Sequence, residues 1–362
     1  MIDNAPSSDL TSLKTPTQAA EVVDVSMLTP VGFDLMSTVT ALRAGINVYK
    51  SSSFLGKNLW PIKTASIPTD ALPPLNSSLR KAGLTSRQKR ILRIATTPLQ
   101  SIFKKVSPEL KVPLFLAAPE KLPGRHHPVN DKMLKMLAIQ SGCPLDLENS
   151  YVIPAGRAAG FYALESAMLM LETGLHPYVL VGGVDSFWDL HWLSTHSAQE
   201  RLLTERSQDA FAPGEAAVFI LLQSPTQAAN RVCIFPPGIG LEPGHRYSEE
   251  PYLGAGLDAA VKEAFVNYQG APIEAVFSSM NGENICAKEW GVSVIRSKSR
   301  FADSLSIIHP ADSLGDVGAA MAPLLMGYAA TSLILNQIKG PCLLWASSEF
   351  ADRGAACIAL EN

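Results

Sequence analysis

Residues 152–160 read VIPAGRAAG, and they lead directly into the apolar run FYALESAMLMLETG at 161–174. A second stretch, GDVGAAMAPLLMGYAATSLILNQIKG at 315–340, has the same pattern, with small residues in a turn before a long apolar run. Both runs are apolar on nearly every face of a helix, which is not the pattern of a helix exposed to water. We therefore expect buried helices over 157–173 and 318–338, each lying between two sheets.

Each of these runs is followed by an apolar strand pattern that ends in small polar residues, YVLVGGVDS at 178–186 and CLLWASS at 342–348. This duplication predicts two similar α/β halves, an N-terminal half over 21–225 and a C-terminal half over 226–362. Residues 1–20 are rich in Ser, Thr, Pro and Asp, which is typical of a flexible arm. The uninterrupted apolar character of 178–186 predicts a strand without an exposed edge.

The composition is that of a protein with a large core, because 47% of its 362 residues are hydrophobic and 17% are charged. Thirty Lys and Arg against 33 Asp and Glu give a net charge of −3, which predicts no nucleic-acid partner. The five cysteines are scattered and never in CxxC spacing, so neither a disulfide framework nor a metal site is expected. The sequence also gives no sign of a cofactor.

The start of the chain has no basic cluster before an apolar stretch, so the sequence predicts no secretory signal and a cytoplasmic location. One segment could be mistaken for a membrane span, because no charged residue lies between Asp316 and Lys339. Pro323, Asn336 and Gln337 interrupt it, and a second such segment is missing. A buried helix is the better interpretation, and we expect no membrane span.

Several segments, taken in order and at their approximate spacing, resemble the signature segments of β-ketoacyl-[acyl-carrier-protein] synthases, which have the thiolase fold. They are VVDVSMLTPVGFDLMSTVTALRAG, VIPAGRAAGFYALESAMLMLETG, YVLVGGVDS, DAFAPGEAAVFILL, LGDVGAAMAPLL and ASSEFADRGAACIAL. The resemblance runs from about Glu21 to Leu360. It implies an α/β fold, namely a thiolase-like five-layer αβαβα core with two pseudo-repeated halves. It also implies a homodimer joined through edge strands beside the nucleophile helix, and condensation of an acyl thioester with a malonyl-carrier thioester.

The catalytic residues of that family are replaced in this chain. The resemblance places the nucleophilic cysteine at Arg157, the two histidines at Asn281 and Gly315, and the lysine near His309 or Pro310. Arginine stays protonated and cannot accept an acyl group as a nucleophile. Cys143 and Cys286 are not at the start of a buried helix, where the helix dipole favours a thiolate. No residue is therefore predicted to be catalytic.

Arg157 has two possible roles. A cation at a helix N-terminus is opposed by the helix dipole, so a nearby negative charge is needed to offset it. Glu283 and Asp316 lie on loops that the resemblance brings to the same cavity, and an Arg–carboxylate pair there would plug the old site and leave no open acyl tunnel. Alternatively, Arg157 binds an anionic ligand. The predicted remnant pocket consists of Arg157, Asn281, Glu283, His309, Asp316 and Phe350.

A basic amphipathic helix is predicted within residues 80–105. Arg87, Lys89, Arg90 and Arg93 on this helix form either an ordinary solvated face or a patch that binds an acyl carrier protein or another acidic protein.

The sequence as a whole predicts a non-catalytic β-ketoacyl synthase-like protein that acts as a binding, scaffold or adaptor partner. Its partner would belong to a synthase and carrier-protein system or to a bacterial secretion system such as type VI secretion. It would form a homodimer or a heterodimer with a paralogous synthase. The alternative is an active acyltransferase, a 3-oxoacyl-carrier-protein synthase-like condensing enzyme with an atypical active site.

Overall fold

A computed structural model describes residues 15–57, 59–121 and 127–361. Most of the arm expected over 1–20 lies outside the described residues.

The first half of the chain contains β1 (Ala20–Leu28), α1 (Leu35–Arg43), β2 (Lys50–Leu55), β3 (Pro61–Thr64), α2 (Ser86–Phe103), β4 (Leu114–Ala117), α3 (Asp131–Ser141), β5 (Tyr151–Ile153), α4 (Ala159–Glu172), β6 (Val179–Ser186), α5 (Leu190–Ala198) and β7 (Glu215–Gln223). The second half contains β8 (Arg231–Ile234), β9 (Gly238–Leu241), α6 (Ala255–Asn267), β10 (Ile273–Ser278), α7 (Asn284–Arg296), β11 (Phe301–Ile308), α8 (Ala311–Leu314), α9 (Met321–Ile334), β12 (Cys342–Ser347) and β13 (Asp352–Glu361).

The two halves have the same strand order. In the first half the order is β5-β4-β6-β7-β1, and in the second it is β11-β10-β12-β13, continued by β8 and β9. The pairing directions also agree, since β4 is parallel to β5 and β6, just as β10 is parallel to β11 and β12. In both halves the next strand, β7 or β13, is antiparallel. The internal repeat expected from the sequence is therefore present.

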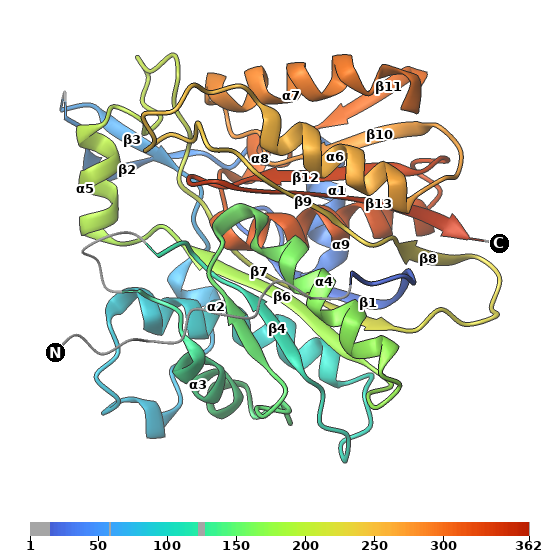
Figure 1. The fold of residues 1–362 in the computed structure, drawn as a ribbon. Helices are drawn as coiled ribbons and strands as arrows, with labels where there is room; N and C mark the ends of the chain where they lie inside the picture. Colours follow the sequence, from blue (N-terminus) through green and yellow to red (C-terminus); the bar gives the residue numbers. More distant parts are fainter. Residues whose placement is uncertain (1–14, 58, 122–126, 362) are drawn as a thin grey trace, which may run out of the picture.

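Five layers result from this arrangement (Figure 1). Helix α2 packs on the outer face of β1, β6 and β7, and α6 packs on the outer face of β9, β12 and β13. Helices α4 and α9 lie between the two sets of strands, where α4 contacts β6 and β13 and α9 contacts β7 and β12. The thiolase-like fold class predicted from the sequence is thus confirmed.

The two central helices are buried, as their apolar runs predict. Every residue of α9 from Met321 to Leu333 is buried, and Pro323 is tolerated because it lies in the first turn of the helix. Phe161 and Leu164 of α4 pack with Leu324 and Leu325 of α9 in the central core. The apolar stretch before Lys339 is therefore a core helix, and among the described residues no helix is long and apolar enough to cross a bilayer.

The open edge of the first half is β5. This strand pairs with β4 on one side and has no strand beyond it among the described residues. Strand β6 pairs with both β4 and β7, which agrees with the prediction that residues 178–186 have no exposed edge. The backbone of β6 is consequently paired on both sides, whereas that of β5 is paired with a strand on one side only among the described residues.

Candidate functional site: an arginine–carboxylate cluster at the start of α4

Arg157 lies in a one-turn 3-10 helix, Gly156–Ala158, directly before α4. Gly156 has a φ of +61°, and a Cβ atom at this position would come within 2.6 Å of the Glu120 side chain. Only glycine satisfies both conditions without strain. The sharp turn places Arg157 at the start of the central helix, and its side chain is buried.

Asp316 is the main partner of Arg157. It precedes α9 and is fully buried. Arg157 donates from Nε to Asp316 Oδ2 at 2.8 Å and also from Nη2 to the same oxygen. Asn281 donates its Nδ2–H to Oδ2 at 2.8 Å, and the backbone N–H of Gly318 donates to Oδ1 at 2.9 Å. The predicted pairing of Arg157 with Glu283 or Asp316 is therefore made with Asp316.

Glu349 is a second carboxylate beside Arg157, and the sequence did not point to it. Its Oε1 accepts from Arg157 Nη2 at 3.3 Å and from Arg201 Nη2 at 2.7 Å. Its Oε2 accepts from Arg201 Nη1 at 2.7 Å and from the Tyr247 hydroxyl at 2.8 Å. Glu349 thus joins the two guanidinium groups.

Glu283 pairs with other arginines. Its two oxygens accept from Nε and Nη2 of Arg201 at 2.8 and 2.9 Å, and Arg246 Nη2 donates to Oε1 at 2.8 Å. Asn281 links this carboxylate to Asp316, because its Nδ2 also lies 3.3 Å from Glu283 Oε2.

We call these six charged residues the arginine–carboxylate cluster: Arg157, Arg201, Arg246, Glu283, Asp316 and Glu349. Its three positive and three negative charges balance. The ring of Phe211 lies 5.9 Å from the guanidinium carbon of Arg157 and 5.3 Å from that of Arg201, so it adds a buried cation–π contact. Burial disfavours the charges of the cluster, and the helix dipole disfavours that of Arg157. These charges are therefore compensated by their partners within the chain.

The electrostatics keep the cluster ionised. Burial alone would lower the pKa of Arg157, but the carboxylates of Asp316 and Glu349 raise it well above its ordinary value. Burial would raise the pKa of Glu349, but hydrogen bonds from Arg201 and the charges of Arg157 and Arg201 hold it well below its usual range. Both partners thus stay charged near neutral pH.

The two cysteines considered as displaced nucleophiles do not have the properties of a nucleophile. Burial raises the pKa of the Cys286 thiol to about 12, and burial also raises the pKa of Cys143. Cys143 follows the end of α3 and does not lie at the start of a central helix. Neither thiol is a ready source of thiolate at neutral pH.

The structure brings together only part of the predicted remnant pocket. Arg157, Asn281, Glu283 and Asp316 are connected by hydrogen bonds, whereas His309 bonds through Nδ1 to the Ser278 hydroxyl at 2.6 Å. Phe350 borders the site. Its backbone N–H donates to Glu120 at 2.8 Å, and its ring packs against Tyr247 at 5.0 Å between centroids. Gly315 has a φ of +74° and ends α8, so it shapes the turn that carries Asp316.

The predicted basic patch on α2 is not formed by its arginines. Arg87 pairs with Asp185, Arg90 pairs with Glu215, and Arg93 donates to three backbone carbonyl groups. Their spacing of three residues puts them on one helix face. There Arg87 and Arg90 reach carboxylates of β6 and β7, and Arg93 reaches the loop at residues 69–73. Lys89, on the opposite face, is exposed. A binding patch made of these four residues is therefore a mistaken expectation, corrected by the packing of α2.

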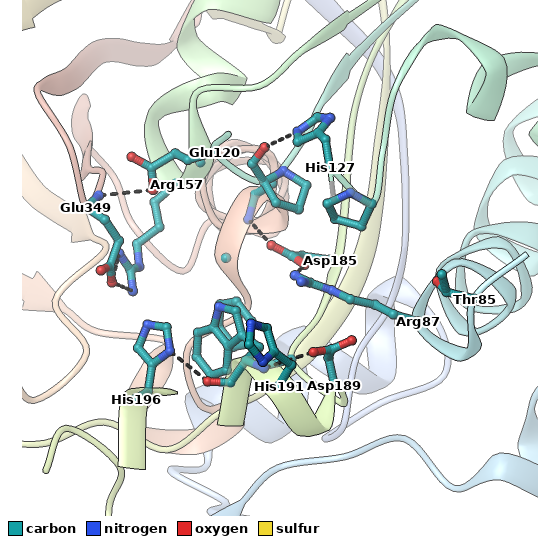
Figure 2. Close-up of a pocket in the computed structure, with 17 residues that line it drawn as sticks. Thr85, Arg87, Glu120, His127, Arg157, Asp185, Asp189, His191, His196 and Glu349 are labelled. Carbon is teal, nitrogen blue, oxygen red and sulfur yellow. Dashed lines mark hydrogen bonds and ion pairs between the residues drawn. The ribbon is translucent and has the colours of Figure 1, made fainter. Parts of the chain in front are cut away.

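A cavity of about 280 Å³ adjoins the cluster (Figure 2). Arg157, Glu349 and Glu120 line one side, and Arg87, Asp185 and His191 line the other. Burial raises the pKa of Glu120 to about 7. The site thus differs from a sealed plug, because Arg157 is one of the residues that line this cavity. In the part of the chain that the structure describes, no group of His, Cys, Asp and Glu side chains is arranged to hold a metal ion.

The residues that the sequence did not reveal are Arg201, Arg246, Glu349, Phe211 and Glu120. One signal was available for Glu349, which precedes Phe350 in a segment that carries the family resemblance. The same signal was available for Phe211, in the segment DAFAPGEAAVFILL, whereas Arg201 precedes that segment in the connection between α5 and β7.

Comparison with known proteins gives no match to a family model and none to a curated protein. Solved structures do match. The ketosynthase from module 6 of the bacillaene synthase of Bacillus subtilis 168 has a TM-score of 0.73 and 12% identity, over 95% of this chain and 72% of that one. The ketosynthase ApeO in complex with its chain length factor ApeC, from Xenorhabdus doucetiae, has a TM-score of 0.70 and 14% identity, over 95% and 98%.

A third similar structure is AntDE:AntF, a type II polyketide synthase acyl-carrier protein in complex with its ketosynthase, with a TM-score of 0.70 and 11% identity over 95% and 99% of the two chains. These values cover nearly the whole of this chain, and they agree with the repeated strand order described above. The chain therefore has the thiolase-like fold of ketosynthases and chain length factors.

Proposed function

We propose that this chain is a non-catalytic ketosynthase-like protein that works by binding a paralogous ketosynthase subunit. The observation that carries the proposal is that Arg157 is held in ion pairs at the position where the resemblance puts the nucleophile. Asp316 and Glu349 hold its guanidinium in place. A thiolate there would need a thiol and a positive environment, and the cluster supplies neither.

The choice of partner follows from the open strand edge and from the similar structures. One of them is a ketosynthase with its chain length factor. In this chain β5 presents an unpaired edge beside the start of α4, and its Tyr151 is 53% exposed. An unpaired strand edge is a ready template for pairing with another chain. We assign this edge to the contact with the partner, which is either a ketosynthase paralogue or a second copy of this chain.

The first experiment tests the absence of catalysis. The purified protein is incubated with acyl-CoA and acyl-carrier thioesters, and its intact mass is measured beside that of an active ketosynthase. We expect an unchanged mass for this chain and an acyl adduct on the control. An adduct on this chain, together with a condensation product from malonyl-carrier thioester, would support the alternative of an active acyltransferase with an atypical active site.

The second experiment tests the partner. The chain is produced alone and together with a ketosynthase paralogue. The masses of the complexes are then determined by sedimentation. Tyr151→Glu should weaken the complex because it puts a charge on the pairing edge, whereas Leu175→Glu, 79% exposed beyond the end of α4, should not. The proposal is contradicted if Tyr151→Glu leaves the amount of complex unchanged, or if the chain stays monomeric in both preparations. Selective binding to a secretion component instead would favour the adaptor role.

A further inference from the structure

The loop between β9 and α6 covers one side of the arginine–carboxylate cluster, and we call its residues 243–253 the strap. Arg246 and Tyr247 of the strap donate to Glu283 and Glu349 of the cluster. The Arg246 side chain is 27% exposed, and Tyr247 is 42% exposed. The other charged side chains of the cluster are much less exposed. The strap therefore makes the outermost contacts of the network.

The base of the strap is fixed to the rest of the molecule. Glu242 is fully buried, and its carboxylate accepts from the backbone N–H groups of Leu253 at 3.3 Å and Gly256 at 2.8 Å. The backbone N–H of Glu242 donates to the carbonyl oxygen of Ala351 at 2.8 Å. These bonds hold the two ends of the strap close together, as in a compact surface loop. Any movement of the strap must therefore occur about this base.

The strap also keeps its own shape. The backbone N–H of Ser248 donates to the carbonyl oxygen of His245 at 2.9 Å, and that of Tyr247 donates to His245 Nδ1 at 3.2 Å. The two arms of the strap touch, because a Cβ atom at Gly244 would lie 2.2 Å from the carbonyl oxygen of Pro251. All these contacts lie within the strap, so they persist if it moves as a unit.

Few bonds attach the tip of the strap. Among the described residues, the hydrogen bonds between residues 244–251 and the rest of the chain involve only the side chains of Arg246 and Tyr247. Arg246 Nη2 donates to Glu283 Oε1 at 2.8 Å, and the Tyr247 hydroxyl donates to Glu349 Oε2 at 2.8 Å. A surface segment with no backbone hydrogen bonds to its surroundings belongs to the part of a protein that opens most easily.

An apolar contact accompanies these two bonds. The ring of Phe350 lies 5.0 Å from that of Tyr247 and 5.4 Å from that of His245, measured between centroids. Salt does not weaken such ring packing, whereas it screens an ion pair that is partly exposed to water. The attachment through Arg246 should consequently depend on ionic strength.

A hollow of about 20 Å³ lies beneath the strap. Arg246 and Tyr252 of the strap line it together with Cys286, Arg157 and Glu349. Arg157 and Glu349 also line the cavity of about 280 Å³ described above. An open strap would therefore give solvent a second way to this ion pair.

We infer that the strap is a lid, closed in this structure, that opens about its base when Arg246 and Tyr247 release their carboxylates. Opening also changes the charge of the site, because the cluster without Arg246 has two positive and three negative charges. The strap thus controls both the access to Arg157 and the charge around it. The inference rests on the contacts of the strap alone, so it does not depend on the proposed partner.

Cys286 serves as the reporter of opening, because it lines the hollow and burial raises the pKa of its thiol to about 12. The full-length protein is treated with N-ethylmaleimide near neutral pH, and the labelling of each cysteine is followed by peptide mass spectrometry. Raising the salt concentration from about 10 mM to about 1 M should speed the labelling of Cys286 about two- to fivefold, since salt screens the bond of Arg246. Cys143, buried in a different core cluster, reports global unfolding, and its labelling rate should not change.

Arg246→Ala should raise the labelling rate of Cys286 about two- to fivefold at low salt and should remove its response to salt. Loss of a positive charge does not itself favour a thiolate, so faster labelling reports exposure. Tyr247→Phe keeps the ring but loses the bond to Glu349. It should act in the same direction and keep the response to salt. Arg80→Ala, at an exposed arginine outside the strap, is the control and should behave as wild type.

Three results would overturn the inference. They are equal labelling rates of Cys286 in wild type and Arg246→Ala, a wild-type rate that salt leaves unchanged, or labelling of Cys143 that accelerates in parallel with that of Cys286. If Arg246→Ala does not fold, the salt dependence of the wild-type protein and the rate of Tyr247→Phe decide. The acyl-adduct and sedimentation experiments are unaffected by a failure here, so the two proposals are tested separately.

Discussion

Arg157 and Asp316 are 159 positions apart in the chain, yet Nε of the arginine lies 2.8 Å from Oδ2 of the aspartate. Each residue belongs to the turn that precedes one of the two central helices, α4 and α9. The internal repeat brings these turns together, so the contact joins the two halves of the molecule at their centre. A buried charge pair in this position has consequences for stability that can be measured.

Arg157→Ala should destabilise the protein strongly. The change leaves fully buried Asp316 without its cation, and breaking a buried pair in this way commonly costs about 3–5 kcal/mol. Arg246→Ala is the matched control, because the Arg246 side chain is 27% exposed and Glu283 keeps both bonds from Arg201. The free energy of unfolding in urea should fall clearly more for the first variant. Equal losses would mean that the Arg157 pair is not desolvated.

Arg157→Cys should give a thiol but no condensing enzyme. The thiol would stand at the start of α4, where the helix dipole favours a thiolate. Asp316, left without its cation, would oppose it, since nearby negative charge disfavours a second anion. The positions assigned to the family histidines also remain Asn281 and Gly315. We expect alkylation by iodoacetamide and no β-ketoacyl product by mass spectrometry. Product formation above the wild-type background would show that the remaining site is competent.

Glu120 should make stability depend on pH. Burial raises the pKa of its carboxyl from an ordinary 4.5 to about 7. Between these values the folded protein holds a proton that the unfolded chain has released, so the contribution of Glu120 to stability falls as pH rises. Glu120→Gln stays neutral. Its free energy of unfolding should therefore improve relative to wild type across this interval. Glu109→Gln, at an exposed carboxylate, is the control. A difference that is constant with pH would refute the shifted pKa.

Gly156→Ala should destabilise the turn before α4. The φ of +61° is unfavourable for alanine, and the new methyl group would lie within 2.6 Å of Glu120. Gly174 offers a control with the same backbone strain, because its φ is +69° and nothing lies within 4 Å of a Cβ there. Thermal melting should show a loss of about 1 kcal/mol for Gly174→Ala and a larger loss for Gly156→Ala. Equal losses would show that Glu120 moves aside freely.

The sequence determined the elements and their layering. Helices that are apolar on every face, such as α9, can only be stable between two layers, so their burial follows from local composition. Strand β6 was recognisable for the same reason. The repeat of a small-residue turn before each central helix also located Arg157 and Asp316, because both belong to those turns.

Only the tertiary structure determined which charged side chains form ion pairs. Arg201 and Glu349 are 148 positions apart and lie in connections without a periodic pattern, so nothing local relates them. The basic helix α2 illustrates the same limit. Its composition suggested a solvated or partner-binding face, but Asp185 and Glu215, buried on neighbouring strands, draw Arg87 and Arg90 inwards. A charge pattern along one helix gives the face on which the residues lie, and only the packing of that face determines whether it meets water or a carboxylate.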